Sequence, residues 1–133
     1  MAFTILAINP GSTSTKCAVY RDGEEAWRKG LTHAADDLAR FRRIQDQFGF
    51  RAQAVRDSLR GATGVAMGSL SAVVGRGGLL RPLPGGVYEV NEAMKADLVS
   101  CRYGTHASNL GALIADSLAT ELGVKAYIVD PVV

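Results

Sequence analysis

The fold is decided near the start of the chain by the stretch Ile8-Asn9-Pro10-Gly11-Ser12-Thr13-Ser14-Thr15-Lys16. Residues 3–8 form a nearly continuous apolar run, which predicts a buried strand leading into this stretch. Residues 13–20 alternate with the period of a second strand, and the Asp-Gly pair after them is typical of a hairpin turn. The quoted stretch is therefore predicted to be a hydroxyl-rich turn between two strands.

This turn has the composition of a site for a phosphoryl group. Its glycine lets the backbone approach an anion closely, and successive N–H groups can form an anion-binding concavity. A Walker loop is excluded, because it needs a glycine directly before the lysine and a helix afterwards, whereas Thr15 precedes Lys16 and a strand follows. An ordinary polar hairpin loop is the alternative, since serine, threonine and glycine are common in turns. The candidate phosphate-binding residues are Gly11, Ser12, Thr13, Ser14 and Lys16.

Composition narrows the class of protein. The chain has 133 residues, of which 47% are hydrophobic and 21% charged, as expected for one soluble globular domain. No apolar run approaches the roughly 20 residues that a membrane span needs, and the first residues do not have the pattern of a signal peptide. We therefore expect a cytoplasmic protein that does not bind membranes. Cys17 and Cys101 are far from any zinc-ligand or disulfide spacing, so two reduced structural thiols are expected.

The positive charge does not indicate a nucleic-acid partner. The net charge is only +2, and acidic residues interleave with the arginines of the central segment. These arginines are interpreted as a solvated helix face, and they are Arg40, Arg42, Arg43, Arg51, Arg56 and Arg60.

The rest of the pattern predicts an α/β fold in a single domain. Apolar residues recur every three or four positions from Asp36 to Arg60, which predicts one long amphipathic helix. A meander of three strands followed by alternating helix and strand predicts a mixed five-stranded sheet with helices on its faces. The other elements are expected at residues 25–31, 69–74 and 125–129 (strands) and at residues 91–99 and 107–122 (helices).

Three polar residues follow the C-terminal ends of predicted strands. They are Asn9, Arg76 and Asp130. Open α/β sheets bind ligands in the crevice at such ends, so we expect these residues to meet at one edge. Arg76 begins a long loop that keeps several leucines, which is unusual for a mere linker. This loop fails as a dinucleotide fingerprint, because Leu80 stands where the third glycine belongs.

Four motifs together resemble butyrate kinase, a member of the acetate kinase family. They are the opening stretch, Val-Val-Gly-Arg-Gly-Gly at 73–78, Tyr-Gly-Thr-His-Ala-Ser-Asn at 103–109, and Ile-Val-Asp-Pro-Val-Val at 128–133. The resemblance runs along essentially the whole chain. It implies a ribonuclease H-like sheet, because the first domain of those proteins has that fold. The acetate kinase family belongs to a larger superfamily that also includes the sugar kinases and actin.

The resemblance implies an activity and a set of residue roles. The reaction would be reversible transfer of the γ-phosphoryl group of ATP to the carboxylate of butyrate, giving butanoyl phosphate and ADP with Mg²⁺ bridging phosphate oxygens. Asn9, Ser12, Ser14 and Lys16 would line the phosphate path. Arg76 would hold the acyl carboxylate or the phosphoryl group, and Asp130 would organise Mg²⁺. His106 would lie near the transferred phosphoryl group. An acyl pocket would be lined by Leu79, Leu80, Leu83 and Val87.

Each of these roles has a structural alternative. Arg76 could be a surface arginine, and Asp130 could simply begin a turn before Pro131. His106 could cap or pack at the start of a helix. The leucines could be core residues beneath a loop, which is slightly favoured over the acyl pocket.

The length of the chain limits what it can do alone. Members of the family have two similar domains with the active site between them, so residues 1–133 would be the N-terminal domain and the second domain would be absent. One domain cannot enclose ATP or exclude water, so we predict that the chain alone is inactive or nearly so. The full-length form would be a homo-oligomer, and an apolar surface exposed by the missing domain would promote self-association. The alternatives are another short-chain or branched-chain carboxylate kinase, and a non-catalytic scaffold with the same fold.

Overall fold

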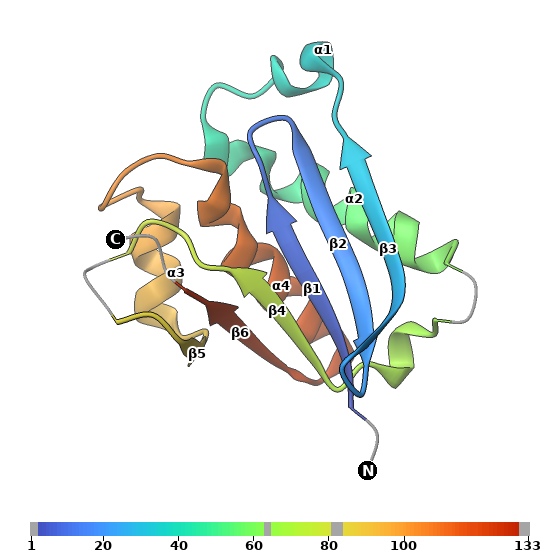
Figure 1. Cartoon of the computed structure of the whole chain (residues 1–133). Helices are drawn as coiled ribbons and strands as arrows, with labels where there is room; N and C mark the ends of the chain where they lie inside the picture. The colour runs from blue at the N-terminus through green and yellow to red at the C-terminus, as the bar shows by residue number, and fades with distance from the viewer. Residues whose placement is uncertain (1–2, 63–64, 81–83, 131–133) are drawn as a thin grey trace.

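The structure is a computed structural model that describes residues 3–62, 65–80 and 84–130 (Figure 1). In these residues one six-stranded sheet runs in the order β3-β2-β1-β4-β6-β5. The strands are β1 (Thr4–Pro10), β2 (Ser14–Arg21), β3 (Glu24–Thr32), β4 (Ala72–Arg76), β5 (Val87–Glu89) and β6 (Lys125–Val129).

The sheet is mixed, as the sequence predicts. β1 pairs antiparallel with β2, and β2 pairs antiparallel with β3, which is the predicted meander. β1, β4 and β6 run parallel, so their C-terminal ends meet at one edge, and β5 returns antiparallel along β6. The predicted fold class is confirmed, with six strands in place of five. β5 was missed because a three-residue strand has too few positions to show a period.

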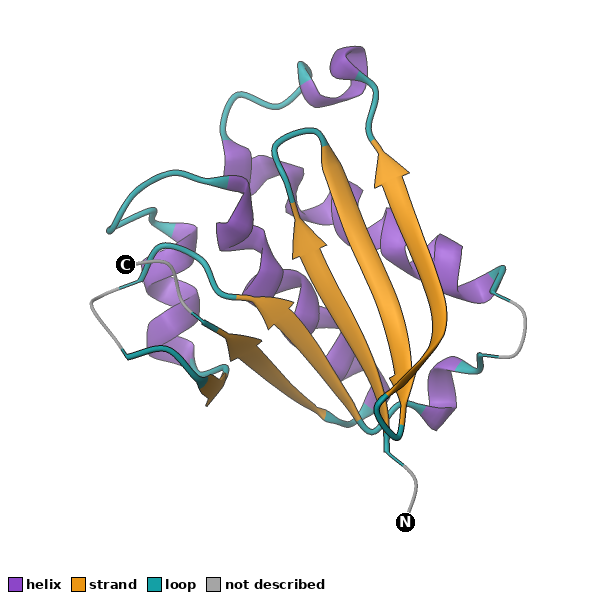
Figure 2. Ribbon diagram, viewed as in Figure 1, coloured by secondary structure: helices purple, strands orange, loops and turns teal. Residues whose placement is uncertain are grey.

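Helices α2 and α4 lie on the same side of the sheet, behind the strands as seen in Figure 2. The helices are α1 (Ala35–Leu38), α2 (Phe48–Arg60), α3 (Glu92–Val99) and α4 (Leu110–Leu122), with short 3-10 turns η1 (Ile44–Gln47), η2 (Met67–Ser69) and η3 (Ala107–Asn109). The main core lies between this helical layer and the sheet and includes Leu6, Val19, Val55, Leu59, Val73, Ile114 and Leu118. Within the described residues, no helix has both the length and the apolar character needed to cross a bilayer.

The prediction of one continuous helix from Asp36 to Arg60 is wrong. The segment forms α1, the turn η1 and α2, with extended backbone at Arg43. The ring of Phe50 in α2 lies 5.3 Å from the ring of His33 and 5.9 Å from that of Phe41, between centroids. These tertiary contacts fold the segment around α1 back over the start of α2, so the apolar period continues although the helix does not.

Glycine permits a close approach between α4 and the end of β4. A Cβ atom added at Gly75 would collide with the backbone carbonyl of Gly111, and one added at Gly111 would collide with the carbonyl oxygen of Arg76. The first turn of α4 therefore lies directly against the strand end that carries Arg76. The two glycines fix this approach because no other residue fits at either position.

Candidate functional site

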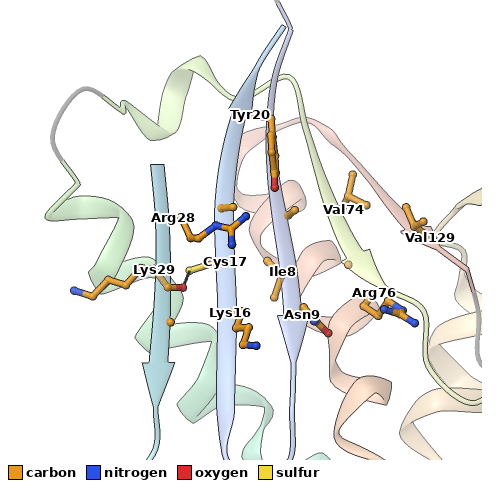
Figure 3. Close-up of a pocket in the computed structure, with 14 residues that line it drawn as sticks. Ile8, Asn9, Lys16, Cys17, Tyr20, Arg28, Lys29, Val74, Arg76 and Val129 are labelled. Atoms are coloured by element: carbon orange, nitrogen blue, oxygen red, sulfur yellow. Dashed lines mark hydrogen bonds between the residues drawn. The ribbon is translucent and has the colours of Figure 1, made fainter. Parts of the chain in front are cut away.

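Three predicted site residues lie side by side at one end of the sheet. The register pairs Asn9 of β1 with Lys16 of β2, and it pairs Ile8 of β1 with Gly75 of β4. Arg76 therefore comes next to Asn9 on the neighbouring strand. The side chains of Asn9, Lys16 and Arg76 are exposed, and Figure 3 shows them grouped near the ends of their strands.

These side chains line a cavity of about 480 Å³ on the sheet face opposite the helices. That volume lies in the range usual for small-ligand sites. The charged residues that line it are all basic, namely Lys16, Arg28, Lys29 and Arg76. Arg28 also pairs with the exposed carboxylate of Glu25 at 2.6 Å. Between them, apolar side chains of the strands form much of the surface, including Ala7, Ala18, Val74 and Val129. The cavity suits an anion that carries a small apolar group.

The turn between β1 and β2 directs its carbonyl groups into the protein. The carbonyl oxygens of Gly11 and Ser12 accept hydrogen bonds from Arg51 at 2.6 and 3.1 Å. The carbonyl of Thr13 accepts from the N–H of His33 at 2.9 Å, and that of Ser14 accepts from the N–H of Gly11 at 2.7 Å and from Arg51 at 2.8 Å. Four successive carbonyl groups of the turn are therefore occupied by donors of the chain.

Arg51 is the donor that holds this turn. Its side chain is completely buried in α2, and it also bonds to Gln47 Oε1 at 3.0 Å and to Thr15 Oγ1 at 3.3 Å. Burial lowers the pKa of its guanidinium, which nevertheless stays charged because arginine starts from a very high value. The interpretation of Arg51 as part of a solvated helix face is wrong.

His33 supports the same turn through Thr15. Its Nε2 lies 2.8 Å from Thr15 Oγ1, and its side chain is buried. Burial lowers the pKa of His33, and the neighbouring charge of Arg51 lowers it further, while Asp37 acts in the opposite direction. The neutral ring is thus favoured next to the buried guanidinium.

Asp130 is the first residue after β6, one position beyond Val129, which pairs with Arg76. Its carboxylate oxygen Oδ1 accepts a hydrogen bond from the N–H of Gly86 at 2.9 Å, and its own N–H donates to the carbonyl of Gly86 at 2.8 Å. It has a positive φ of 51° and is exposed, and it is not among the residues that line the cavity. Asp130 thus shares the strand-end edge with Arg76 but also serves as a turn residue.

His106 caps the turn that leads into α4. Its Nδ1 accepts a hydrogen bond from the N–H of Ser108 at 3.0 Å, and the side chain is exposed. In a neutral ring whose Nδ1 accepts, the proton is on Nε2. Nδ1 of His106 thus makes the cap that the structural alternative predicts. The Nε2–H group can still donate to a ligand.

The predicted acyl-pocket residues that the structure describes lie in different environments. Leu80 is buried and packs with Leu98 and Ile128, as the core alternative requires. Leu79 packs against Gly104, while Val87 is 65% exposed on β5. Leu83 lies outside the described residues.

Three supporting residues were not predicted from the sequence. They are Arg51, His33 and Asn109. Asn109 is buried, and it accepts from the N–H of Leu79 at 2.8 Å and donates to the carbonyl of Gly104 at 2.9 Å, joining two loops at the strand ends. Asn109 ends the quoted motif at residues 103–109, and Arg51 also had a signal in the sequence. It lies three residues after Phe48 and four before Val55, which places it inside the apolar stripe of the helix.

A possible metal site has few ligands of its own. Among the described residues, no three histidine, cysteine, aspartate or glutamate side chains gather as a metal-binding group. Mg²⁺ needs only one or two carboxylates when phosphate oxygens and waters complete its shell. The second carboxylate oxygen of Asp130 fits that minimal requirement.

The chain is similar along its whole length to butyrate kinases. It is 50% identical over 133 residues to a probable butyrate kinase of Listeria innocua, covering all of this chain and 37% of that protein. It is also 50% identical over 131 residues to butyrate kinase 1 of Clostridium acetobutylicum, covering 98% of this chain and 37% of that protein. The chain thus spans little more than a third of the length of these relatives. No protein-family model matches it.

Solved structures show the same fold at low sequence identity. The acetate kinase of Porphyromonas gingivalis aligns with a TM-score of 0.59 and 13% identity over 96% of this chain and 37% of that one. A propionate kinase of Francisella tularensis aligns with a TM-score of 0.52 and 14% identity over 96% of this chain and 36% of that one. The resemblance to butyrate kinase seen in the sequence is confirmed, and the fold matches that of carboxylate kinases.

Proposed function

Because this chain is similar along its whole length to butyrate kinases, we propose that it provides one wall of a carboxylate-kinase active site. It corresponds to the N-terminal domain of a two-domain enzyme that transfers the γ-phosphoryl group of ATP to butyrate, giving butanoyl phosphate and ADP. The observation that carries this proposal is the row of Lys16, Asn9 and Arg76 beside a turn whose carbonyl groups are all bound from within.

The row and the turn bind the phosphoryl group in complementary ways. Lys16 supplies a compact charge, and Arg76 presents a planar fork that matches a carboxylate or phosphoryl group. Asn9 lies between them and donates through its amide. The hydroxyls of Ser12 and Ser14 and the backbone N–H groups of the turn complete the phosphate path. Such fixed donors stabilise charge that develops on the transferred group without having to reorganise.

His106 and Asp130 act at the edge of this row. The Nε2–H of His106 donates to an oxygen of the transferred phosphoryl group. Asp130 would supply a carboxylate ligand to Mg²⁺, and the metal would neutralise charge on the phosphate oxygens when bound. Asp130 contributes only its second oxygen, because the first is held by the N–H of Gly86.

The short carboxylate lies on the open sheet face. Small apolar side chains between the basic residues of the cavity, among them Ala18 and Val74, can pack against a four-carbon chain. Leu79 remains a candidate for one edge of an acyl pocket.

The chain alone lacks the second wall of the cleft, so we expect it to bind anions without turning over. To test this, the chain replaces the 131 matching residues of the Clostridium acetobutylicum butyrate kinase 1. The chimera is expected to form butanoyl phosphate, measured as its hydroxamate, while the chain alone forms none. An inactive but folded chimera, or one that prefers acetate to butyrate, would contradict the assignment.

Arg76→Ala in the chimera tests the site itself. We expect the rate to fall by about a hundredfold or more, as when one preorganised donor is lost from an active site. The matched control is Arg60→Ala, because Arg60 is an exposed arginine paired only loosely with Asp57 at 3.7 Å. The control should keep a rate close to that of the parent chimera. Equal rates for both variants would remove Arg76 from the site.

A further inference from the structure

Arg51 places a positive charge directly beneath the turn that is proposed to bind phosphate. The guanidinium is fully buried, and its hydrogen-bond partners are all neutral oxygens: three backbone carbonyls, an amide and a hydroxyl. Within residues 3–62, 65–80 and 84–130, no carboxylate forms an ion pair with it. A buried charge without a counterion is costly, so its retention calls for a reason beyond packing.

The geometry of the peptide bond gives that reason. In a trans peptide the C=O of one residue and the N–H of the next point in opposite directions, and the described peptide bonds are all trans. The carbonyls of Gly11 and Ser12 point at Arg51, so the N–H groups of Ser12 and Thr13 point away from it. Neither N–H bonds to any described residue, and both residues are exposed.

The buried guanidinium, the peptide dipoles of the turn and an anion outside the turn attract one another in sequence. The buried cation attracts the negative ends of two peptide dipoles, whose positive ends then face away from it. Successive N–H groups held in this way bind anions, and a charge behind them strengthens the field at the outer side. An anion outside the turn would in turn compensate the buried cation. Helix α2 is therefore joined electrostatically, as well as by hydrogen bonds, to whatever occupies the turn.

We propose that Arg51 is a positioning residue for phosphoryl binding, which fixes the outward N–H groups of Ser12 and Thr13 and supplies charge behind them. This proposal rests on the proposed function, because it concerns the same phosphate path. Arg51 does not touch the ligand, and it acts only through the backbone of the turn. The ligand it favours is a phosphoryl group carrying two or more negative charges.

The test titrates the ¹⁵N-labelled chain with inorganic phosphate and follows amide and arginine Nε–H resonances. We expect shifts at Ser12 and Thr13, and a shift of the Arg51 Nε–H although it lies on the inner side of the turn. Arg51→Lys keeps the charge but loses the fork, and Arg51→Met loses both. Each is expected to raise the phosphate Kd by roughly tenfold or more, with Met above Lys, because hydrogen bonds to charged groups carry an effect of that size.

Arg56 provides the matched controls. It lies five residues later on α2, and its guanidinium pairs with Glu121 at 2.8 Å and bonds to Ser117, both on α4. Arg56→Lys and Arg56→Met loosen the same helix without touching the turn, so they should leave the phosphate Kd unchanged. If they weaken binding as much as the Arg51 variants do, Arg51 has only a structural role and the proposal fails.

The outcomes separate this proposal from the function on which it rests. Shifts at Lys16 and Arg76 with none at Ser12, Thr13 or the Arg51 Nε–H would overturn the proposal and leave an anion site on the row. Folded Arg51 variants that bind phosphate as the parent does would also overturn it. No response anywhere in the chain would contradict both. If the Arg51 variants do not fold, the Nε–H response of the unmodified chain decides, because it needs no substitution.

Discussion

The two sides of the proposed site are built differently. The turn between β1 and β2 is held from within by a buried arginine and a buried histidine, which together occupy its carbonyls and a hydroxyl. On the other side, Arg76, His106 and Asp130 are exposed and are positioned by strand register, a helix cap and a turn. The first side is organised before any ligand binds. The second is placed by the sheet but left free to meet a ligand or another domain.

The largest loss of stability is expected where α4 packs against β4, because this contact supports the strand end that carries Arg76. Gly75→Ala would push a methyl group into the backbone at Gly111, so we expect the free energy of unfolding to fall by about 3 kcal/mol. Gly30→Ala is the control, because a Cβ at Gly30 would meet nothing within 4 Å. Urea unfolding of both variants measures the difference. A Gly75→Ala variant as stable as the control would show that this approach is not a constraint.

Substitution of Arg51 should destabilise the protein more than substitution of His106. Arg51→Met removes the guanidinium donor from three part-buried carbonyl groups, and we expect a loss of about 2–3 kcal/mol in the free energy of unfolding. His106→Ala removes a single part-buried cap contact, so the expected loss is about 0.5–1 kcal/mol. Urea unfolding at pH 7.5 compares the two. Equal losses would mean that the two sides are equally held and that the contrast is wrong.

The pH dependence of stability should come from the turn through His33. Its pKa in the folded protein is lowered from 6.5, chiefly by burial, so below that pH the unfolded chain takes up a proton that the folded chain resists. The contribution of His33 to stability is therefore fully present well above pH 6.5 and is lost progressively as the pH falls below that value. Urea unfolding at pH 7.5 and 5.5 measures the loss. His33→Gln keeps a donor near Thr15 and should reduce that loss, and an unchanged loss would rule out His33 as its source.

The smallest expected effect is a difference in reactivity between the two thiols, Cys17 and Cys101. Burial raises the pKa of Cys17 to about 11, so this thiol is protonated at neutral pH and also covered. Cys101 lies in the less buried loop before η3. At pH 7.5 we expect a maleimide reagent to modify Cys101 at least about tenfold faster than Cys17, as measured by mass spectrometry of the peptides. Faster modification of Cys17 would show that the turn region opens more readily than its packing implies.

The sequence was sufficient where a local pattern and the final contacts agree. The strand run before Asn9, the alternation up to Tyr20 and the Gly123 stop after α4 each reflect a local rule, and these elements appear as predicted. Strand ends also predicted that Asn9 and Arg76 would be neighbours, because parallel strands bring their C-terminal ends to one edge.

The sequence was insufficient where a long-range contact decides. Charged residues usually lie on a solvated face, which is why the sequence predicts that place for Arg51, yet its partners in the turn are some 40 residues earlier in the chain. The break between α1 and α2 depends on the ring contacts of Phe50, and β5 exists only through its pairing with β6. No local period reports such contacts.

We propose that the turn and the strand-end row bind one ligand together. The most direct measurement is a titration of the ¹⁵N-labelled chain with butanoyl phosphate. We expect the amides of Ser12 and Thr13 and the signals of Lys16 and Arg76 to shift with one common Kd. Shifts in neither the turn nor the loop after β4 would contradict it and would favour a scaffold that kept the sheet and lost the chemistry.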